Sequence, residues 1–254
     1  MKQRVVSILI LAALIISLLP QGVLFVSAYS DTDIAYPVEG GNIYFAKTTG
    51  TITDCDESVT KVDIPSEIDG VAVKIIGDYA FYNCDSLYSV TIPSGVTSIS
   101  NCAFTHCSCL MEVTIPDSVT NIGISAFNGC SSLTSATIPN GVTSIGSFLF
   151  FDCNSLISVL IPESITSIGE NAFGSCSSLT DVIIPNRVKS IGGGAFMNCS
   201  SLTSITIPNS VNEIGMFAFS FCNSLTGIWV ADRNMYFSND EFGVIFDKNK
   251  GILL

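Results

Sequence analysis

One short stretch, NCAFTHCSC, gathers residue types that bind metals or act as nucleophiles. It holds Cys102, His106, Cys107 and Cys109, which together offer the sulfur and imidazole donors that zinc favours. His106 is the single histidine of the chain, so a Cys–His catalytic pair would have to use it. Whether either chemistry is available depends on the elements that position these four side chains.

The stretch belongs to a sequence unit that recurs every 23 residues. The unit reads Cys-x-x-Leu-x-x-Val-x-Ile-Pro-x-x-Val-x-x-Ile-Gly-x-x-Ala-Phe-x-x, and a period of about 20 to 50 residues is typical of a solenoid. One such unit cannot bury its apolar face alone, whereas stacked units bury it against each other. The cysteines that begin the units are Cys84, Cys107, Cys130, Cys153, Cys176, Cys199 and Cys222.

The apolar columns of the unit predict the path of each coil. The stretch from leucine to isoleucine is rich in β-branched residues and predicts a short strand, and stacking makes these strands parallel. The proline that follows has no N–H and ends the ladder. Val-x-x-Ile-Gly predicts a second short strand. The Ala-Phe segment predicts one helical or 3₁₀ turn, with the phenylalanine between coils.

The unit SLTSITIPNSVNEIGMFAFSFC, residues 201–222, resembles the unit of the BspA-like leucine-rich repeat family. The resemblance extends over about Ile64 to Val230, with three departures from the pattern at Ser100, Leu149 and Ala231. It implies a right-handed leucine-rich-repeat-like coil, mainly parallel β with short helical or 3₁₀ turns. It also implies a bacterial secreted or cell-surface protein that binds host matrix proteins, cells or other surface proteins.

The repeat separates the four candidate ligands of NCAFTHCSC. Cys107 belongs to the column of buried cysteines, Cys109 lies in a column otherwise filled by serine, and side chains on different sides of a coil cannot share one ion. His106 and Cys107 are sequence neighbours, which diverge on a turn. A local Cys102–Cys109 disulfide remains an alternative. We therefore expect no metal, no cofactor and no enzymatic activity, with the column cysteines acting as small apolar core residues.

The first 28 residues have the composition of a secretory signal peptide. Lys2 and Arg4 precede an apolar run that ends at Pro20, and small residues lead to Ala28. The run is shorter than the roughly 20 residues of a membrane-spanning helix. We expect cleavage after Ala28, a secreted or cell-surface protein, and no membrane insertion of the mature chain.

The rest of the chain divides into three parts. Residues 29–74 predict an N-terminal capping hairpin and a degenerate first repeat, and residues 75–230 predict the repeat array. Residues 231–254 predict a C-terminal hairpin cap or the start of a further repeat.

The charge of the chain excludes two classes of partner. The net charge is -12, and no lysine or arginine occurs between Lys74 and Arg187. A surface of this kind repels phosphate groups and anionic lipid headgroups, so we expect no binding to nucleic acid.

The outward positions of the first strands are the candidate binding surface. Most of them are serine or threonine, and a few apolar or charged residues interrupt this regular polar face. Exposed apolar groups on a polar face favour an interaction site, and tryptophan is enriched where partners bind. The candidate ligand-binding residues are Met111, Glu112, Ile157, Leu160, Asp181, Ile183 and Trp229.

These observations predict a binding or adhesion module whose partner is a host matrix or surface protein. The alternative is a structural spacer or assembly module of the cell envelope without a specific ligand. A third hypothesis is a carbohydrate-targeting module for glycans. It ranks last because the outward strand positions offer only Tyr88 and Trp229 as aromatic platforms.

Overall fold

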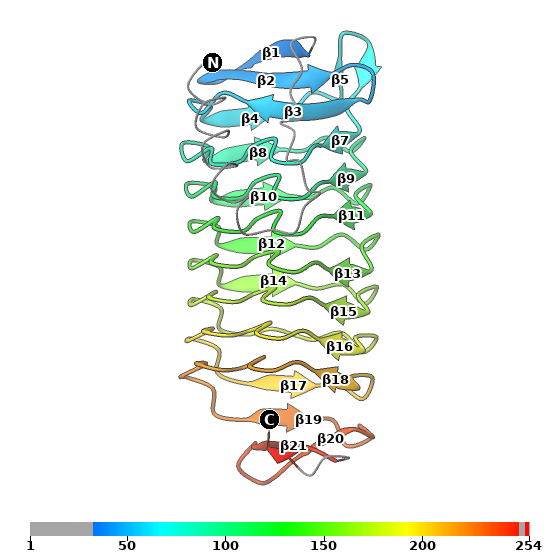
Figure 1. The fold of residues 1–254 in the computed structure, drawn as a ribbon, viewed down its shortest axis with the longest axis vertical. Helices are drawn as coiled ribbons and strands as arrows, with labels where there is room; N and C mark the ends of the chain where they lie inside the picture. The colour runs from blue at the N-terminus through cyan, green and yellow to red at the C-terminus, as the bar shows by residue number, and fades with distance from the viewer. Residues whose placement is uncertain (1–32, 249–251, 254) are drawn as a thin grey trace, which may run out of the picture.

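The computed structural model describes residues 33–248 and 252–253, so the predicted signal peptide, residues 1–28, lies outside it. The described residues form an elongated solenoid, with coils stacked along its long axis and the described ends of the chain at opposite ends (Figure 1). Strands 23 residues apart pair in parallel, as Ser135 pairs with Ser158. The predicted parallel-strand solenoid with one coil per 23 residues is confirmed.

The first strand of each coil lies on one side of the solenoid, whose outward side chains we call the strand face. In the first five of these strands the middle residue is buried and its two neighbours point outward, because side chains alternate along a strand. The strands are β4 (Lys61–Asp63), β8 (Ser89–Thr91), β10 (Glu112–Thr114), β12 (Ser135–Thr137), β14 (Ser158–Leu160), β17 (Ile205–Ile207) and β19 (Ile228–Val230).

The second strand of each coil is two residues long and follows the proline. Its isoleucine packs into the core, and the next residue is usually the glycine of the unit. These strands are β7 (Ile75–Ile76), β9 (Ser98–Ile99), β11 (Asn121–Ile122), β13 (Ser144–Ile145), β15 (Ser167–Ile168), β16 (Ser190–Ile191) and β18 (Glu213–Ile214).

From the glycine to the cysteine of each unit the chain forms a turn, and we call this part of the coils the turn side. The predicted helical or 3₁₀ turn is wrong, because no helix of either kind forms within the described residues. Two residues of each turn have positive φ, such as Tyr79 and Asn83, both at 60°. A helix needs consecutive right-handed residues, and these left-handed ones interrupt it. Among the described residues there is accordingly no helix long and apolar enough to cross a membrane.

The core is one continuous apolar column that runs along the axis. The phenylalanine rings of neighbouring coils stack face to face, with centroids 4.9 Å apart for Phe81 and Phe104 and 5.7 Å apart for Phe196 and Phe219. Burying a side chain of this size stabilises the fold by roughly 1.5–3 kcal/mol. Each inner ring is buried by the coils on both sides, so the coils stabilise each other.

An antiparallel hairpin covers the N-terminal end of the array. Thr51 of this hairpin pairs in parallel with Ile75, which joins the hairpin to the second strands. The carboxylate of Asp56 accepts hydrogen bonds from the Asn42 backbone N–H, the Asn42 side-chain amide and the Tyr44 hydroxyl, each at 2.9 Å. The strands are β1 (Ile34–Val38), β2 (Gly41–Ala46), β3 (Thr51–Cys55) and a smaller pair, β5 (Glu67–Ile68) and β6 (Val71–Ala72).

The C-terminal end carries a second antiparallel segment, formed by β20 (Phe237–Asn239), β21 (Ile245–Asp247) and β22 (Ile252–Leu253). Asn234 joins this segment to the last coils from a buried position. Its side-chain amide donates to the carbonyl oxygens of Pro208 at 2.8 Å and Val211 at 2.9 Å. Its side-chain oxygen accepts from the backbone amides of Tyr236 and Phe237.

Candidate functional site

All seven sequence-predicted site residues are exposed in the structure. Among the apolar ones, Leu160 and Ile183 are the most exposed, at 64% and 76%, and they occupy the same position in neighbouring coils. Met111, Ile157 and Trp229 keep between 41% and 58% of their surface exposed. The structure therefore presents these apolar side chains to solvent instead of using them in the core.

Four of the seven residues line one open groove of about 540 Å³ on the strand face. Ile157, Leu160 and Ile183 supply its apolar surface. Acidic side chains accompany them, from Asp181, which the sequence pattern singles out, and from Asp117 and Glu163, which it does not. The groove thus combines an apolar floor with carboxylates.

The strand ladder is interrupted at this groove. β14 is the last strand of a five-stranded sheet, and β17 begins a separate two-stranded sheet. Residues 181–184 lie between them and, within the described part of the chain, make no backbone hydrogen bond to either neighbouring strand. The second strands of the same coils remain paired, as Ser167 pairs with Ser190 and Ser190 with Glu213; their own ladder is interrupted elsewhere, between β11 and β13. The interruption therefore concerns the strand face alone and leaves backbone donors and acceptors beside the apolar groove.

The other predicted site residues lie apart from this groove. Met111 and Glu112 line a shallower depression with Ser135 and its neighbours. Trp229 is on β19, where it pairs with Thr206 and its indole ring approaches Gly227. The structure consequently divides the seven predicted residues among three places on the strand face.

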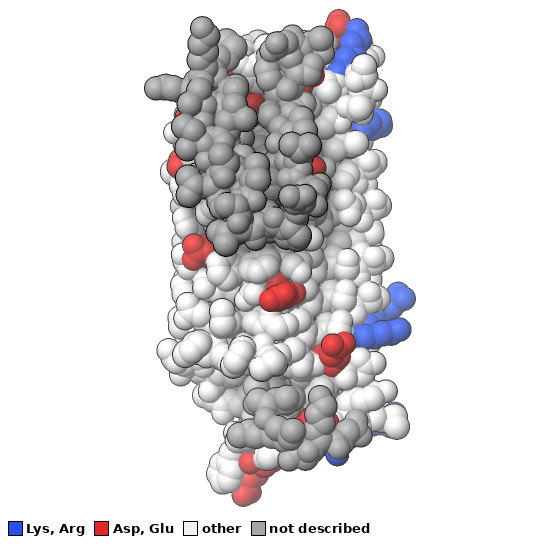
Figure 2. Space-filling view, in the orientation of Figure 1, with Lys and Arg blue, Asp and Glu red and all other residues white. Residues whose placement is uncertain are grey.

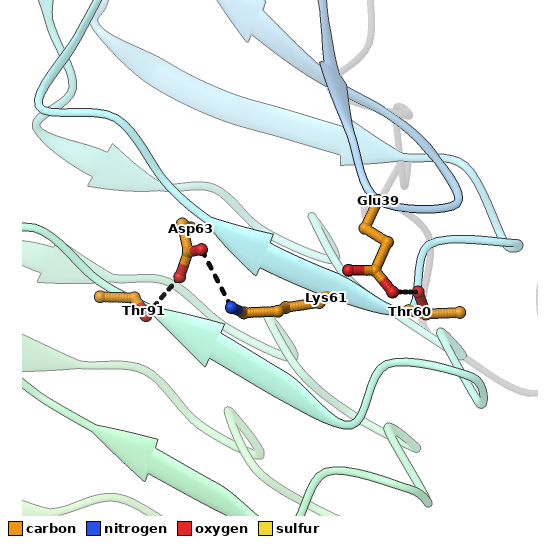
Figure 3. A network of polar contacts seen from close by, with 5 residues as sticks. All are labelled: Glu39, Thr60, Lys61, Asp63 and Thr91. Atoms are coloured by element: carbon orange, nitrogen blue, oxygen red, sulfur yellow. Dashed lines mark hydrogen bonds and ion pairs between the residues drawn. The ribbon is translucent and has the colours of Figure 1, made fainter.

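The N-terminal part of the strand face has a different character, because its outward side chains pair with one another (Figure 3). The Lys61 ammonium lies 3.3 Å from the Asp63 carboxylate, which also accepts a 2.8 Å hydrogen bond from the Thr91 hydroxyl. The Thr91 hydrogen bond, followed by Lys61, lowers the pKa of Asp63. Thr60 donates similarly to Glu39 at 3.2 Å. Polar groups that satisfy each other in this way leave little for a partner to bind.

The comparison with protein families matches almost the whole array. The model of the BspA type leucine rich repeat region matches residues 53–180 and 144–244, with six copies. The chain belongs to this family. A comparison with curated proteins found no match.

Solved structures of other leucine-rich repeat proteins have a similar fold. A leucine rich cell surface protein from Faecalibacterium prausnitzii is 29% identical, with a TM-score of 0.58 over 89% of this chain and 61% of that chain. A leucine-rich repeat protein from Eubacterium ventriosum is 26% identical, with a TM-score of 0.66 over 80% of this chain and 52% of that one. A T. pallidum leucine rich repeat protein is 31% identical, with a TM-score of 0.51 over 76% of this chain and 80% of its own. The chain therefore spans less than two thirds of the first two relatives.

The turn side of the BspA-type coil separates the cysteine and histidine side chains of the NCAFTHCSC stretch. Cys107 is buried, whereas His106 and Cys109 are exposed, and no group of metal-binding side chains forms among the described residues. His106 lies instead beside the Tyr82 ring, at 6.1 Å between centroids. Cys102 and Cys109 are both free thiols, so the alternative disulfide between them does not form.

The column cysteines form a ladder of thiols that donate to backbone carbonyls. Cys107 donates to the carbonyl of Phe81 at 3.0 Å, and the same bond recurs in each later coil. Burial raises the pKa of Cys130 to about 12 and raises that of Cys176 as well. A thiol that stays protonated is a poor nucleophile, which makes these cysteines structural.

Cys84 is the exception in the column, because it is joined to Cys55 in a disulfide. The pattern of the array gives no sign of this pair, since Cys55 precedes the first regular unit. The bond fastens the N-terminal hairpin to the turn side of the first coil.

Proposed function

We propose that this protein is an exported, surface-exposed binding module, and that a protein partner binds the groove formed by Ile157, Leu160 and Ile183. One observation carries the proposal: strongly exposed apolar side chains line a groove at the interruption of the strand ladder. Exposed apolar patches of this kind mark interaction sites. Backbone groups of residues 181–184 add hydrogen-bonding capacity beside the apolar surface.

The partner that fits this groove is a polypeptide with apolar side chains next to cationic ones. The carboxylates of Asp117, Glu163 and Asp181 line the groove, and the chain between Lys74 and Arg187 has no cation to neutralise them. Opposite charges steer association and fix the orientation of a partner. The description of the Faecalibacterium prausnitzii relative as a cell surface protein supports the location and the class of function.

The test is binding of the purified chain, without residues 1–28, to immobilised fibronectin and fibrinogen and to a glycan array, at low and high salt. The double variant Leu160→Ser/Ile183→Ser should weaken saturable protein binding by at least about tenfold, because interface energy concentrates in a few apolar anchors. Ile124→Ser is the matched control, because Ile124 is 54% exposed but lies on the turn side.

Equal affinity of the wild type and the double variant would remove the groove as the site. Binding confined to glycans would support the carbohydrate hypothesis. A folded protein that binds none of these probes would favour the spacer, which the regular serine and threonine positions of the remaining strand face would suit.

A further inference from the structure

The groove on the strand face has a regular pattern of charged and apolar side chains. On β14 the outward residues are Ser158 and Leu160, on either side of the buried Val159. In the next coil Asp181 and Ile183 occupy the same two positions, and both are exposed. Alternate residues of a strand are about 6.6 Å apart. A carboxylate and the apolar pair of Leu160 and Ile183 therefore lie side by side on the groove surface.

Carboxylates also border the apolar pair on its other side. Glu163 follows Leu160 by three residues, just after the proline that ends the strand, and Asp117 occupies the same position two coils earlier. Both residues are exposed and both line the groove. The backbone N–H of Asn186 donates to the Glu163 carboxylate at 3.2 Å, which holds that carboxylate at the proline corner. Along the direction of the coil, the groove thus presents an acidic, an apolar and a second acidic position.

Within the described part of the chain, no lysine or arginine forms an ion pair with these carboxylates. The ion pairs of the described residues join Lys47 to Asp69 and Lys61 to Asp63, in the N-terminal part of the solenoid. In Figure 2 the visible cations lie along the right-hand edge of the molecule, and the middle of the surface carries carboxylates on a largely uncharged background. The carboxylates of the groove are therefore available to cations of a partner.

The apolar pair is short along the axis of the solenoid. The column that holds Leu160 and Ile183 continues with Thr137 on one side and Thr206 on the other. A helix that lay along the axis would therefore meet two apolar side chains, about 4.8 Å apart, and then threonine. An extended segment that lies along the coil direction instead places alternate side chains about 6.6 Å apart, which is the spacing of the outward residues beneath it. The pattern of the groove thus favours an extended partner.

We propose, as an inference that rests on the proposed function, that the groove binds an extended segment with a lysine or arginine, an apolar residue and a second lysine or arginine alternating on one face. The apolar side chain contacts Leu160 and Ile183. One cation pairs with Asp181, and the long side chain of the other reaches Glu163 or Asp117 at the proline corner. These carboxylates determine specificity, because a segment with acidic residues at the two flanking positions is repelled.

Two synthetic peptides of identical composition test the spacing. Thr-Lys-Thr-Leu-Thr-Lys-Thr carries both lysines on the face of the leucine, and threonine favours an extended backbone. Thr-Thr-Lys-Leu-Lys-Thr-Thr carries both lysines on the opposite face. The first peptide should bind the purified chain, without residues 1–28, at least about fivefold more tightly than the second, because only the first can form both ion pairs while its leucine is in the groove. Fluorescence anisotropy titrations at low salt measure both affinities.

Variants of the carboxylates test which of them act. Asp181→Asn and the double variant Asp117→Asn/Glu163→Gln should each weaken binding of the first peptide about threefold, because each removes one exposed ion pair. Each should also reduce the loss of affinity that high salt causes. Glu213→Gln is the matched control, because Glu213 is an exposed carboxylate on the second strand β18, and it should leave both measurements unchanged.

The position of the segment is tested by exchanging charges. Asp181→Lys should abolish the preference for the first peptide, and replacing one of its two lysines by glutamate should restore the lost affinity. The lysine whose replacement restores binding identifies the end of the segment that lies at Asp181. If neither replacement restores binding, the proposed ion pair with Asp181 is wrong.

Equal affinities of the two peptides, or no binding of either at millimolar concentration, would overturn the proposal of an extended segment. The proposed function is tested separately, because Leu160→Ser/Ile183→Ser is measured with whole proteins. If that variant weakens binding of fibronectin or fibrinogen while the two peptides bind equally, the groove is a binding site and the extended segment is wrong. If that variant leaves protein binding unchanged, the groove itself is wrong as the site.

Discussion

The two ends of the solenoid bury the apolar surfaces of their terminal coils in different ways. A coil buries its apolar surface only against a neighbour, so the first and last coils each have one surface without a coil beside it. At the N-terminal end a hairpin, the Cys55–Cys84 disulfide and the carboxylate of Asp56 close that surface completely enough to bury Phe81. At the C-terminal end the described residues cover the strand side of the last coil and leave Phe219, on its turn side, only partly buried.

This difference shows that closing a solenoid requires separate solutions for its separate sides. Asn234 satisfies the carbonyls of Pro208 and Val211 at the proline corner, which lies between the two strands of the coil. It does nothing for the amides of Phe217 and Phe221, which lie on the turn side.

The largest expected difference between an inner coil and the C-terminal end concerns phenylalanine. Phe150→Ala should lower the free energy of unfolding by about 3–5 kcal/mol, because it leaves a cavity between two coils. Phe219→Ala should cost about half as much, because that side chain is already partly exposed. Urea unfolding of both variants measures the difference. Equal losses would show that the partial exposure of Phe219 does not reduce its contribution to stability.

The two caps should also differ when a key polar residue is removed. Asn234→Ala leaves the Val211 carbonyl and the backbone amides of Tyr236 and Phe237 without the Asn234 side chain in a buried site, and it should cost about 3 kcal/mol. Asp56→Ala removes three hydrogen bonds at a half-buried site and should cost about 2 kcal/mol. Thermal and urea unfolding would compare them. A larger loss of stability for Asp56→Ala would show that the N-terminal hairpin contributes more to the stability of the fold than the C-terminal segment does.

Alkaline pH should destabilise the array through its inner thiols. The pKa of Cys130 is raised to about 12, above its ordinary value of 9.0, so the unfolded chain releases this proton first. Stability is therefore complete below pH 9.0 and falls between pH 9.0 and about pH 12, by up to roughly 1.4 kcal/mol per pH unit. Urea unfolding as a function of pH, repeated with Cys130→Val, should show a shallower decline for the variant. Identical slopes would exclude this thiol as the cause.

The smallest expected effect is a gain in stability at the C-terminal end. Phe217→Asn should stabilise the folded chain by about 0.5–1 kcal/mol, because asparagine tolerates the left-handed backbone. Phe217→Ala is the control, since alanine removes the ring without improving that conformation. Urea unfolding would compare the two variants. If the alanine and asparagine variants have the same free energy of unfolding, strain in the left-handed backbone is not the reason that Phe217 lowers stability.

Much of the fold could be predicted from the repeat, because the residue types found at one position in all the units indicate whether that position is buried. Leucine, valine and isoleucine at fixed spacing placed the strands and the core, and the alternation along the strands identified Leu160 and Ile183 as exposed. The turn side was predicted wrongly, because an Ala-Phe pair in a short segment is compatible with a helical turn. The positive φ at Tyr79 and Asn83 is not visible in one unit. Asparagine, glycine and aspartate in the Asn83 column were the signal that could have revealed it.

The candidate groove could be predicted only in part. Residue exposure follows from the strand alternation, but Asp117 and Glu163 come from the proline corners, and their approach to Leu160 depends on how coils stack. The interruption of the ladder at residues 181–184 has no counterpart in the sequence, where Asp181 to Pro185 follows the repeat without a gap.

The sequence by itself determined that the chain is a solenoid, since a repeat that cannot bury its own apolar face must stack. It also determined the acidic, cation-free middle and the thiol column. Only the tertiary structure decided which end is closed, where the strand ladder is interrupted and which exposed side chains share a groove. The physical reason is that columns describe contacts between equivalent residues of identical coils, whereas ends, interruptions and grooves are made by contacts between residues that are not equivalent.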